Sequence, residues 1–246
     1  MRPKEFTKKL LQSVFGFETY LYYFSRYKID TLHRDPNEKI MFRFIDLIPD
    51  GSLILDIGAN LGFITYHLAQ KRDCAVLSFE PIPTNLAVLN RIVANKKLAN
   101  VTVCPYALGD VNATVNMVMP LENGVPMQGL SHVKTDGETT EGREFTVPVK
   151  RLDELIEISS SGKRVGGIKI DAEDYEYFIL TGGLNLIKKD KPVICVELWE
   201  NENRERSLLL LASLGYTPYV LSNGDLVKLA GQSTHLDGNN FVCLPN

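Results

Sequence analysis

From residue 52 onward, short apolar runs rich in β-branched residues alternate with segments in which apolar residues recur every three or four positions. This alternation predicts an α/β fold with a doubly wound, mostly parallel sheet covered by helices on both faces. The predicted strands are SLILDIG (52–58), CAVLSFE (74–80), VTVCPYAL (101–108), GGIKIDAE (166–173) and PVICVEL (192–198). The predicted crossover helices are 63–71, 84–98, 175–189 and 204–216.

The end of the chain departs from this alternation. TPYVLSN (217–223) and NNFVCLP (239–245) are two strand patterns with no helix-length segment between them, which favours an antiparallel pair that closes the sheet. Residues 110–150 are irregular, with TVNMVMP (114–120) and EFTVPVK (144–150) patterned as edge strands. We expect this insertion to reach over the carboxyl ends of the core strands, near an acceptor site.

The first 48 residues predict a helical extension that precedes the main domain at 49–246. DPNEKIMFRFIDLI (35–48) has the pattern of a capped amphipathic helix, whereas residues 4–28 carry eight aromatic residues mixed with Lys and Arg. Simple packing is the expected role of this aromatic segment. A lid over the substrate, a homodimer contact and a peripheral membrane-surface patch are the alternatives.

Composition limits the classes of function. With 44% hydrophobic residues in 246, the chain can bury a full core. A net charge of −3 does not favour nucleic acid as the substrate, because phosphate binding needs excess positive charge. The four cysteines are far apart, without CxxC spacing, and are expected to be reduced and buried. Charged residues interrupt the apolar N-terminal run, so we expect neither a signal peptide nor a transmembrane segment, and a cytoplasmic location.

The stretch LILDIGANLGF (53–63) joins a buried strand to a helix through a glycine turn that suits nucleotide binding. The dinucleotide fingerprint requires Gly at positions one, three and six, whereas here Asn60 and Phe63 follow Gly58 at positions three and six. Asp56 at the strand end would be unfavourable beside a pyrophosphate. It suits a ligand with a cationic centre and an ammonium group, such as S-adenosyl-L-methionine.

A second acid strengthens this interpretation. Glu80 ends the next strand, within Phe79-Glu80-Pro81, where a carboxylate can accept hydrogen bonds from both ribose hydroxyls. Tyr106-Ala107-Leu108-Gly109-Asp110 follows the third strand and supplies small and polar residues where an adenine edge would lie. Each element alone is weak, but their order and spacing over about 55 residues predict one nucleoside site.

The chain resembles the FkbM family of S-adenosylmethionine-dependent methyltransferases over roughly residues 36 to 245. The matching motifs are LDIGANLGF, SFEPIPTN, PYALGD, RLDEL, IKIDAEDYE, the Glu of VICVELWE, and NNFVCLP. The family pattern K-x-D-x-E-G-x-E is met here except that Asp174 takes the glycine position. Asp is a good N-cap residue, so we expect the helix start to survive this change.

The resemblance implies the seven-stranded class I methyltransferase fold, with its last strand antiparallel. It also implies O-methylation of a hydroxyl on a small-molecule or saccharide acceptor. We expect the residues that bind S-adenosyl-L-methionine to be Asp56, Gly58, Ala59, Asn60, Gly62, Phe63, Glu80, Pro81, Asn85, Ala107 and Asp171.

The catalytic candidates lie after the fourth and fifth strands, because ligands bind beyond the carboxyl ends of parallel strands. They are Lys169, Asp171, Glu173 and Glu197. Either Asp171 or Glu173 could accept the proton of the acceptor hydroxyl, while Lys169 could adjust their pKa values or form an ordinary ion pair. The same acids could hold magnesium, but the charge of Lys169 favours a metal-free site.

Two other classes of function stay open from the sequence. One is an NAD(P)-dependent oxidoreductase on a related sheet, which the spacing of the glycine turn disfavours. The other is a non-catalytic binding module that retains the fold. A nucleic-acid methyltransferase is not expected, because Asp171-Ala172-Glu173-Asp174 lacks the prolines and aromatic residue that grip a flipped base.

Overall fold

The computed structural model describes residues 12, 15–122, 124–135, 137–229 and 238–246. The expected core strands are β1 (Leu53–Ile57), β2 (Ala75–Phe79), β3 (Val101–Cys104), β9 (Val165–Ile170), β10 (Val193–Glu197), β11 (Tyr216–Ser222) and β13 (Asn240–Pro245). They lie in one sheet in the order β12-β11-β13-β10-β9-β1-β2-β3, in which β13 is antiparallel to both β10 and β11. This order confirms the class I methyltransferase fold.

The sheet has one strand more than expected. β12 (Asp225–Lys228) pairs antiparallel with β11 and forms an edge of the sheet. The two residues between these strands, Asn223 and Gly224, both have positive φ, at 51° and 90°. Asn-Gly with positive φ at both positions is the preferred two-residue hairpin turn. The hairpin therefore follows from local turn chemistry.

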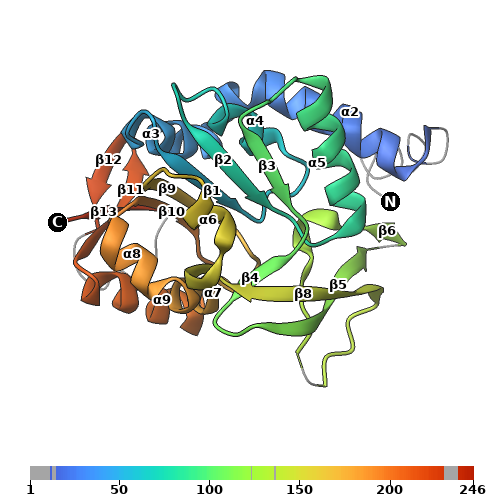
Figure 1. Ribbon diagram of the computed structural model, residues 1–246. Helices are drawn as coiled ribbons and strands as arrows, with labels where there is room; N and C mark the ends of the chain where they lie inside the picture. The colour runs from blue at the N-terminus through green and yellow to red at the C-terminus, as the bar shows by residue number, and fades with distance from the viewer. Residues whose placement is uncertain (1–11, 13–14, 123, 136, 230–237) are drawn as a thin grey trace.

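Helices cover both faces of the sheet (Figure 1). On one face lie α2 (Phe17–Thr31), α3 (Lys39–Leu47), α4 (Phe63–Leu68) and α5 (Pro83–Asn95), and on the other α6 (Ile156–Ser160), α7 (Glu176–Gly182), α8 (Leu184–Asp190) and α9 (Glu202–Ser213). The single helix expected over 175–189 is wrong, since it breaks between α7 and α8. A Cβ on Gly182 would lie 1.9 Å from the carbonyl oxygen of Gly109, so this close approach requires glycine.

The insertion forms a second sheet (Figure 1). β5 (Ala113–Glu122) pairs antiparallel with β8 (Gly142–Arg151), and β4 (Ala107–Gly109), β6 (Val125–Pro126) and β7 (His132–Val133) complete it. The strand expected over 101–108 is therefore divided. β3 stays in the main sheet, whereas β4 pairs with β8, and the two are separated at Pro105, which has no backbone N–H for a ladder.

The N-terminal extension packs on the main domain. Side chains of α2 form a buried cluster with α5 and with the glycine turn, made of Leu21, Tyr22, Ile29, Leu61, Val88 and Ile92. Residues 1–11 and 13–14 of the aromatic segment lie outside the described residues. The expected capped helix is η2 (Pro36–Glu38) followed by α3, and the Asp35 side chain accepts a hydrogen bond from the Asn37 backbone N–H.

The four cysteines, Cys74, Cys104, Cys195 and Cys243, are free and buried, as expected. Among the residues that the structure describes, no helix combines the length and apolar character needed to cross a membrane.

Candidate functional site

The glycine turn between β1 and α4 joins three strands at their carboxyl ends. Gly58 has φ +73°, and a Cβ there would lie 1.8 Å from the carbonyl oxygen of Asp171, so no other residue fits. The N–H groups of Gly58 and Ala59 both donate to the Phe79 carbonyl, at 3.1 and 2.9 Å. These donors hold β1 and β2 together, so neither N–H group is free to bind a ligand.

Glu80, directly after β2, is fixed by backbone donors. It is 4% exposed, and its two carboxyl oxygens accept hydrogen bonds from the N–H groups of Asn60 and Ile82, each at 2.8 Å. Burial raises the pKa of Glu80 to about 7, although both of these hydrogen bonds act against the shift. Each oxygen keeps a second lone pair, so the carboxyl can accept further hydrogen bonds from a ligand.

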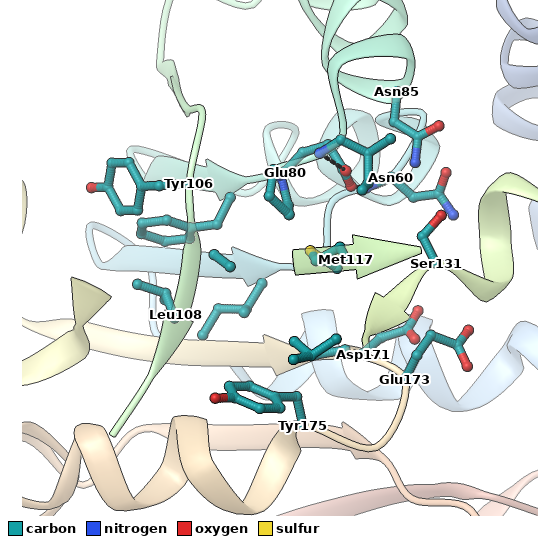
Figure 2. A pocket seen from close by; sticks show the side chains of 18 of the residues that line it. Asn60, Glu80, Asn85, Tyr106, Leu108, Met117, Ser131, Asp171, Glu173 and Tyr175 are labelled. Carbon is teal, nitrogen blue, oxygen red and sulfur yellow. Dashed lines mark hydrogen bonds between the residues drawn. The ribbon is translucent and has the colours of Figure 1, made fainter. Parts of the chain in front are cut away.

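A cleft lies over these strand ends, with about 630 Å³ of empty space including the part open to solvent. Figure 2 shows Glu80 and Asn60 on one side of it and Asp171 and Glu173 on the other, with Ser131 from the insertion nearby. Its lining includes the predicted cofactor residues Gly58, Asn60, Glu80, Pro81, Asn85, Ala107 and Asp171. The insertion contributes Met117, Gln128, Gly129, Ser131 and Val133, which supports the expectation that it reaches over the strand ends.

Three buried side-chain oxygens at this cleft have no hydrogen-bond partner among the described residues. They are Asn60 Oδ1, Asn85 Oδ1 and Gln128 Oε1. Asn85 is 2% exposed, and its amide nitrogen donates to the Gln128 carbonyl at 3.4 Å. Because buried acceptors are nearly always satisfied, these three oxygens indicate a ligand or water that donates hydrogen bonds.

Lys169 is the buried cation of the site. Its Nζ lies 3.6 Å from Asp56 Oδ1 and 3.4 Å from Asp171 Oδ2, and it donates to the Gly58 carbonyl at 2.7 Å. Burial opposes its charge, but the carboxylates of Asp171 and Asp56 raise the pKa of Lys169. Lys169 thus links the carboxyl ends of β1 and β9. This is the ion-pair role, one of the two roles that the sequence left open for Lys169.

Asp56 and Gly62 are placed differently from the expectation. Asp56 is fully buried behind the turn, where its Oδ2 accepts a hydrogen bond from Thr65 Oγ1 of α4 at 2.6 Å. Gly62 begins α4 in the left-handed conformation and packs against Leu89. Neither residue lines the cleft. Both shape the turn in this structure, and their contact with the cofactor stays a prediction.

A second groove, of about 770 Å³ including open solvent, adjoins the cleft on the other side of the turn. Gly58, Asn60 and Asp171 line both. The second groove contains the remaining predicted residues Ala59, Phe63, Lys169 and Glu197, together with Asn37, Glu38, Met41 and Asn240. Residues of η2 and α3 therefore wall this groove, and the lid alternative for the aromatic segment at 4–28 stays a prediction.

The turn after β9 presents Asp171 and Glu173 in an unusual backbone conformation. Glu173 and Asp174 have φ values of +47° and +74°, a left-handed region that favours glycine. Asp174 is not the N-cap expected from the sequence, since Tyr175 occupies that position. Instead, Asp174 Oδ1 accepts a hydrogen bond from Asn201, and the Ala172 N–H is bound by Glu176 Oε1.

Carboxyl groups crowd the junction of cleft and groove. Burial, and then the charges of Asp171 and Glu197, raise the pKa of Glu173 to about 8. Burial and Asp171 likewise raise the pKa of Glu197 to about 7, against the effect of Lys169. Glu176, left out of the predicted site, is 1% exposed, and burial raises its pKa to about 7. Carboxyls with pKa values near neutrality can exchange protons at physiological pH.

The sequence did not identify several residues of the site. Gln128 and Ser131 line the cleft but are not among the predicted site residues. The neighbouring His132 is outside the cleft lining and contacts the Leu130 carbonyl and Glu138, at 2.9 and 2.8 Å. The indole N–H of Trp199 donates a hydrogen bond to Glu173. Trp199 follows Glu197, the acid at the end of β10, and this position in the sequence was the signal that could have identified it. Among the described residues, no three His, Cys, Asp or Glu side chains are grouped as metal ligands.

Known proteins match both the sequence and the fold. The model of the Methyltransferase FkbM domain matches residues 56–218, more than half of the chain. Methyltransferase 1 of Beauveria bassiana (strain ARSEF 2860) is 26% identical over 151 residues, which span 54% of this chain and 59% of that protein. The crystal structure of Methyltransferase FkbM from Methylobacillus flagellatus KT has a TM-score of 0.51 at 14% identity, covering 83% of this chain and 50% of that one. By its motifs, its fold and its match to the domain model, the chain belongs to the FkbM methyltransferase family.

Proposed function

We propose that the chain is an S-adenosyl-L-methionine-dependent methyltransferase that methylates a hydroxyl oxygen of a small metabolite or a saccharide. The observation that carries this proposal is the arrangement of carboxyls around one cleft. Glu80 lies at the end of β2, while Asp171 and Glu173 lie across the cleft at the end of β9. The first suits a nucleoside, and the other two suit proton transfer beside it.

The lining of the cleft fits S-adenosyl-L-methionine. The unpartnered oxygens of Asn60, Asn85 and Gln128 need donors, and this cofactor supplies ribose hydroxyls, an adenine amine and an ammonium group. Glu80 would hold the ribose, Ala107 and Tyr106 would border the adenine, and Asp171 would lie near the amino-acid end. When bound, the cofactor supplies an electrophilic methyl group.

We assign the proton-accepting role to Glu173. A general base works best when its pKa lies near the working pH, and the pKa of Glu173 is about 8. Asp171 is ion-paired with Lys169, so part of its charge is already balanced. Lys169 holds Asp171 and the Gly58 carbonyl in place and thereby fixes the distance between the glycine turn and β9. We propose that this site works without a metal ion, with magnesium bound by the same acids as the alternative.

The charge around the site supports an uncharged or cationic acceptor. Asp171 and Glu173 line the cleft, and Glu197 and Glu38 line the adjoining groove. In their ionised forms these carboxyls would repel phosphate groups, which argues against nucleic acid. The amides of Asn37 and Asn240 in the same groove could bind hydroxyl groups of the acceptor.

Two measurements test the proposal. Calorimetric titration with S-adenosyl-L-methionine and with its demethylated product should give saturable binding of both. A screen of hydroxylated acceptors with the labelled cofactor should then give labelled ethers, and nucleic acids should give no label. Absence of cofactor binding would instead support a non-catalytic module that retains the fold. Binding of NAD(P) would support the alternative of an NAD(P)-dependent oxidoreductase, which membership of the FkbM family disfavours.

A further inference from the structure

Trp199 is the single tryptophan of the chain and lies just beyond β10. Its side chain is 41% exposed, which is unusual for so large an apolar group. Its indole Nε1–H donates to Glu173 Oε2 at 3.2 Å. The exposed ring is therefore held in one orientation by the carboxyl that lines the cleft.

The segment that carries Trp199 also fixes the backbone beneath Glu173. Asn201 donates to Asp174 Oδ1 at 2.5 Å, and Asn203 donates to the Asp174 carbonyl at 3.0 Å. Glu173 and Asp174 both have positive φ, a left-handed conformation that is strained for non-glycine residues. Such a pair persists only where the surroundings hold it, and these three hydrogen bonds from 199–203 do so.

We propose that Trp199 is a positioning residue that fixes the Glu173 carboxyl toward the cleft and favours its ionised form. The indole N–H occupies Oε2 and leaves Oε1 for the acceptor. The groups that face Glu173 from the neighbouring elements are Asp171, Glu197, Glu176 and Trp199. The three carboxyls act to keep Glu173 protonated, and Trp199 is the donor that opposes them. The catalytic consequence rests on the proposed function, whereas the contact itself does not.

Tryptophan fluorescence tests the contact without any acceptor. Because the chain has one tryptophan, its emission should change with pH as Glu173 titrates, with a midpoint near the Glu173 pKa of about 8. Glu173→Gln should remove the transition centred near pH 8, whereas a change near pH 7 belongs to Glu197, whose pKa burial raises to about 7. Tyr219→Phe, which removes a hydroxyl elsewhere in the sheet, should leave the transition near pH 8 intact. Emission without a transition near pH 8, or a transition there that persists in Glu173→Gln, overturns the proposal.

Kinetics of Trp199→Phe test the consequence, since phenylalanine keeps a ring but lacks the donor. Turnover should fall about tenfold, with cofactor affinity nearly unchanged, because one hydrogen bond to a charged group is lost. The acid limb of the kcat/KM profile should move to higher pH, since the donor that favours ionised Glu173 is gone. A folded variant with an unmoved pH profile overturns the positioning role. If no acceptor is methylated at all, the proposed function fails, and the fluorescence titration still decides the contact.

Discussion

Glu80 is the residue whose replacement most directly tests the cofactor site. Glu80→Ala removes a buried carboxyl that lines the cleft and also frees the N–H groups of Asn60 and Ile82. We expect a loss of about 1.5 to 3 kcal/mol in S-adenosyl-L-methionine binding, about tenfold to a hundredfold in Kd. Glu80→Gln keeps one acceptor oxygen and should lose less. Calorimetry measures both, and unchanged affinity in folded Glu80→Ala would place the nucleoside elsewhere.

Glu173 should control turnover and not cofactor binding. Glu173→Gln cannot accept a proton, so kcat should fall about a hundredfold or more, while Kd for the cofactor changes little. Because the base acts when ionised and its pKa is about 8, the wild-type rate should rise as pH increases through that value. A pH–rate profile measured with saturating cofactor checks this. A rate that falls over the same range would remove Glu173 from the role of base.

Metal dependence is decided by the same group of acids. The ion pair between Lys169 and Asp171 offsets charge that a divalent cation would need, so enzyme treated with a chelator should keep most of its activity. The measurement is methyl transfer before and after chelation, with magnesium added back. Activity that is abolished by the chelator and restored by magnesium would establish the metal-assisted alternative with the same residues.

At the scale of elements, the parallel core strands and most of their helices could be predicted from periodicity. The carboxyls Glu80, Asp171 and Glu197 could be placed together, because the ends of parallel strands meet at one edge of the sheet. The close approach of Gly182, at the end of α7, to Gly109 joins positions that are 73 residues apart in the chain. The Trp199–Glu173 bond likewise joins separate segments. Periodicity carries no information on such contacts, whereas the Asn223-Gly224 turn was a local signal.

The helix α2 should stabilise the glycine turn through a buried hydrogen bond. Ser25 is fully buried, and its hydroxyl donates to the Leu61 carbonyl at 2.8 Å. Ser25→Ala leaves that carbonyl unpaired, so the free energy of unfolding should fall by about 1 to 3 kcal/mol, and cofactor affinity should weaken as the turn loosens. Urea unfolding and calorimetry measure the two effects.

Thr31→Ala is the matched control for this variant. It removes an exposed hydroxyl that donates to the Tyr27 carbonyl on the same helix, also at 2.8 Å. Its effect should be small, because water can replace an exposed hydrogen bond. Equal effects of the two variants would show that α2 stabilises the protein without acting on the turn.

Across the whole molecule, buried carboxyls should make stability depend on pH. Burial raises the pKa of Glu80, Glu176 and Glu197 to about 7 and that of Glu173 to about 8, all from 4.5. Between pH 4.5 and 8 the native state therefore binds more protons than the unfolded chain. Stability then decreases as pH rises through this window. Burial also raises the pKa of Asp56 and Glu38, which adds to this trend. His67, whose pKa is lowered by burial, acts in the opposite direction.

Replacing Glu176 tests the effect of buried carboxyls on stability without changing the cleft, because Glu176 is 1% exposed and lies outside the cleft lining. Glu176→Gln keeps an oxygen for the Ala172 N–H but never ionises. Between pH 5 and pH 8.5 the variant should gain stability relative to the wild type, by up to about 3 kcal/mol for a shift from 4.5 to about 7. Urea unfolding at both pH values gives the difference. Glu205→Gln, on an exposed position of α9, should leave the pH slope unchanged. Equal slopes for wild type and Glu176→Gln would mean that Glu176 is not the proton-binding group.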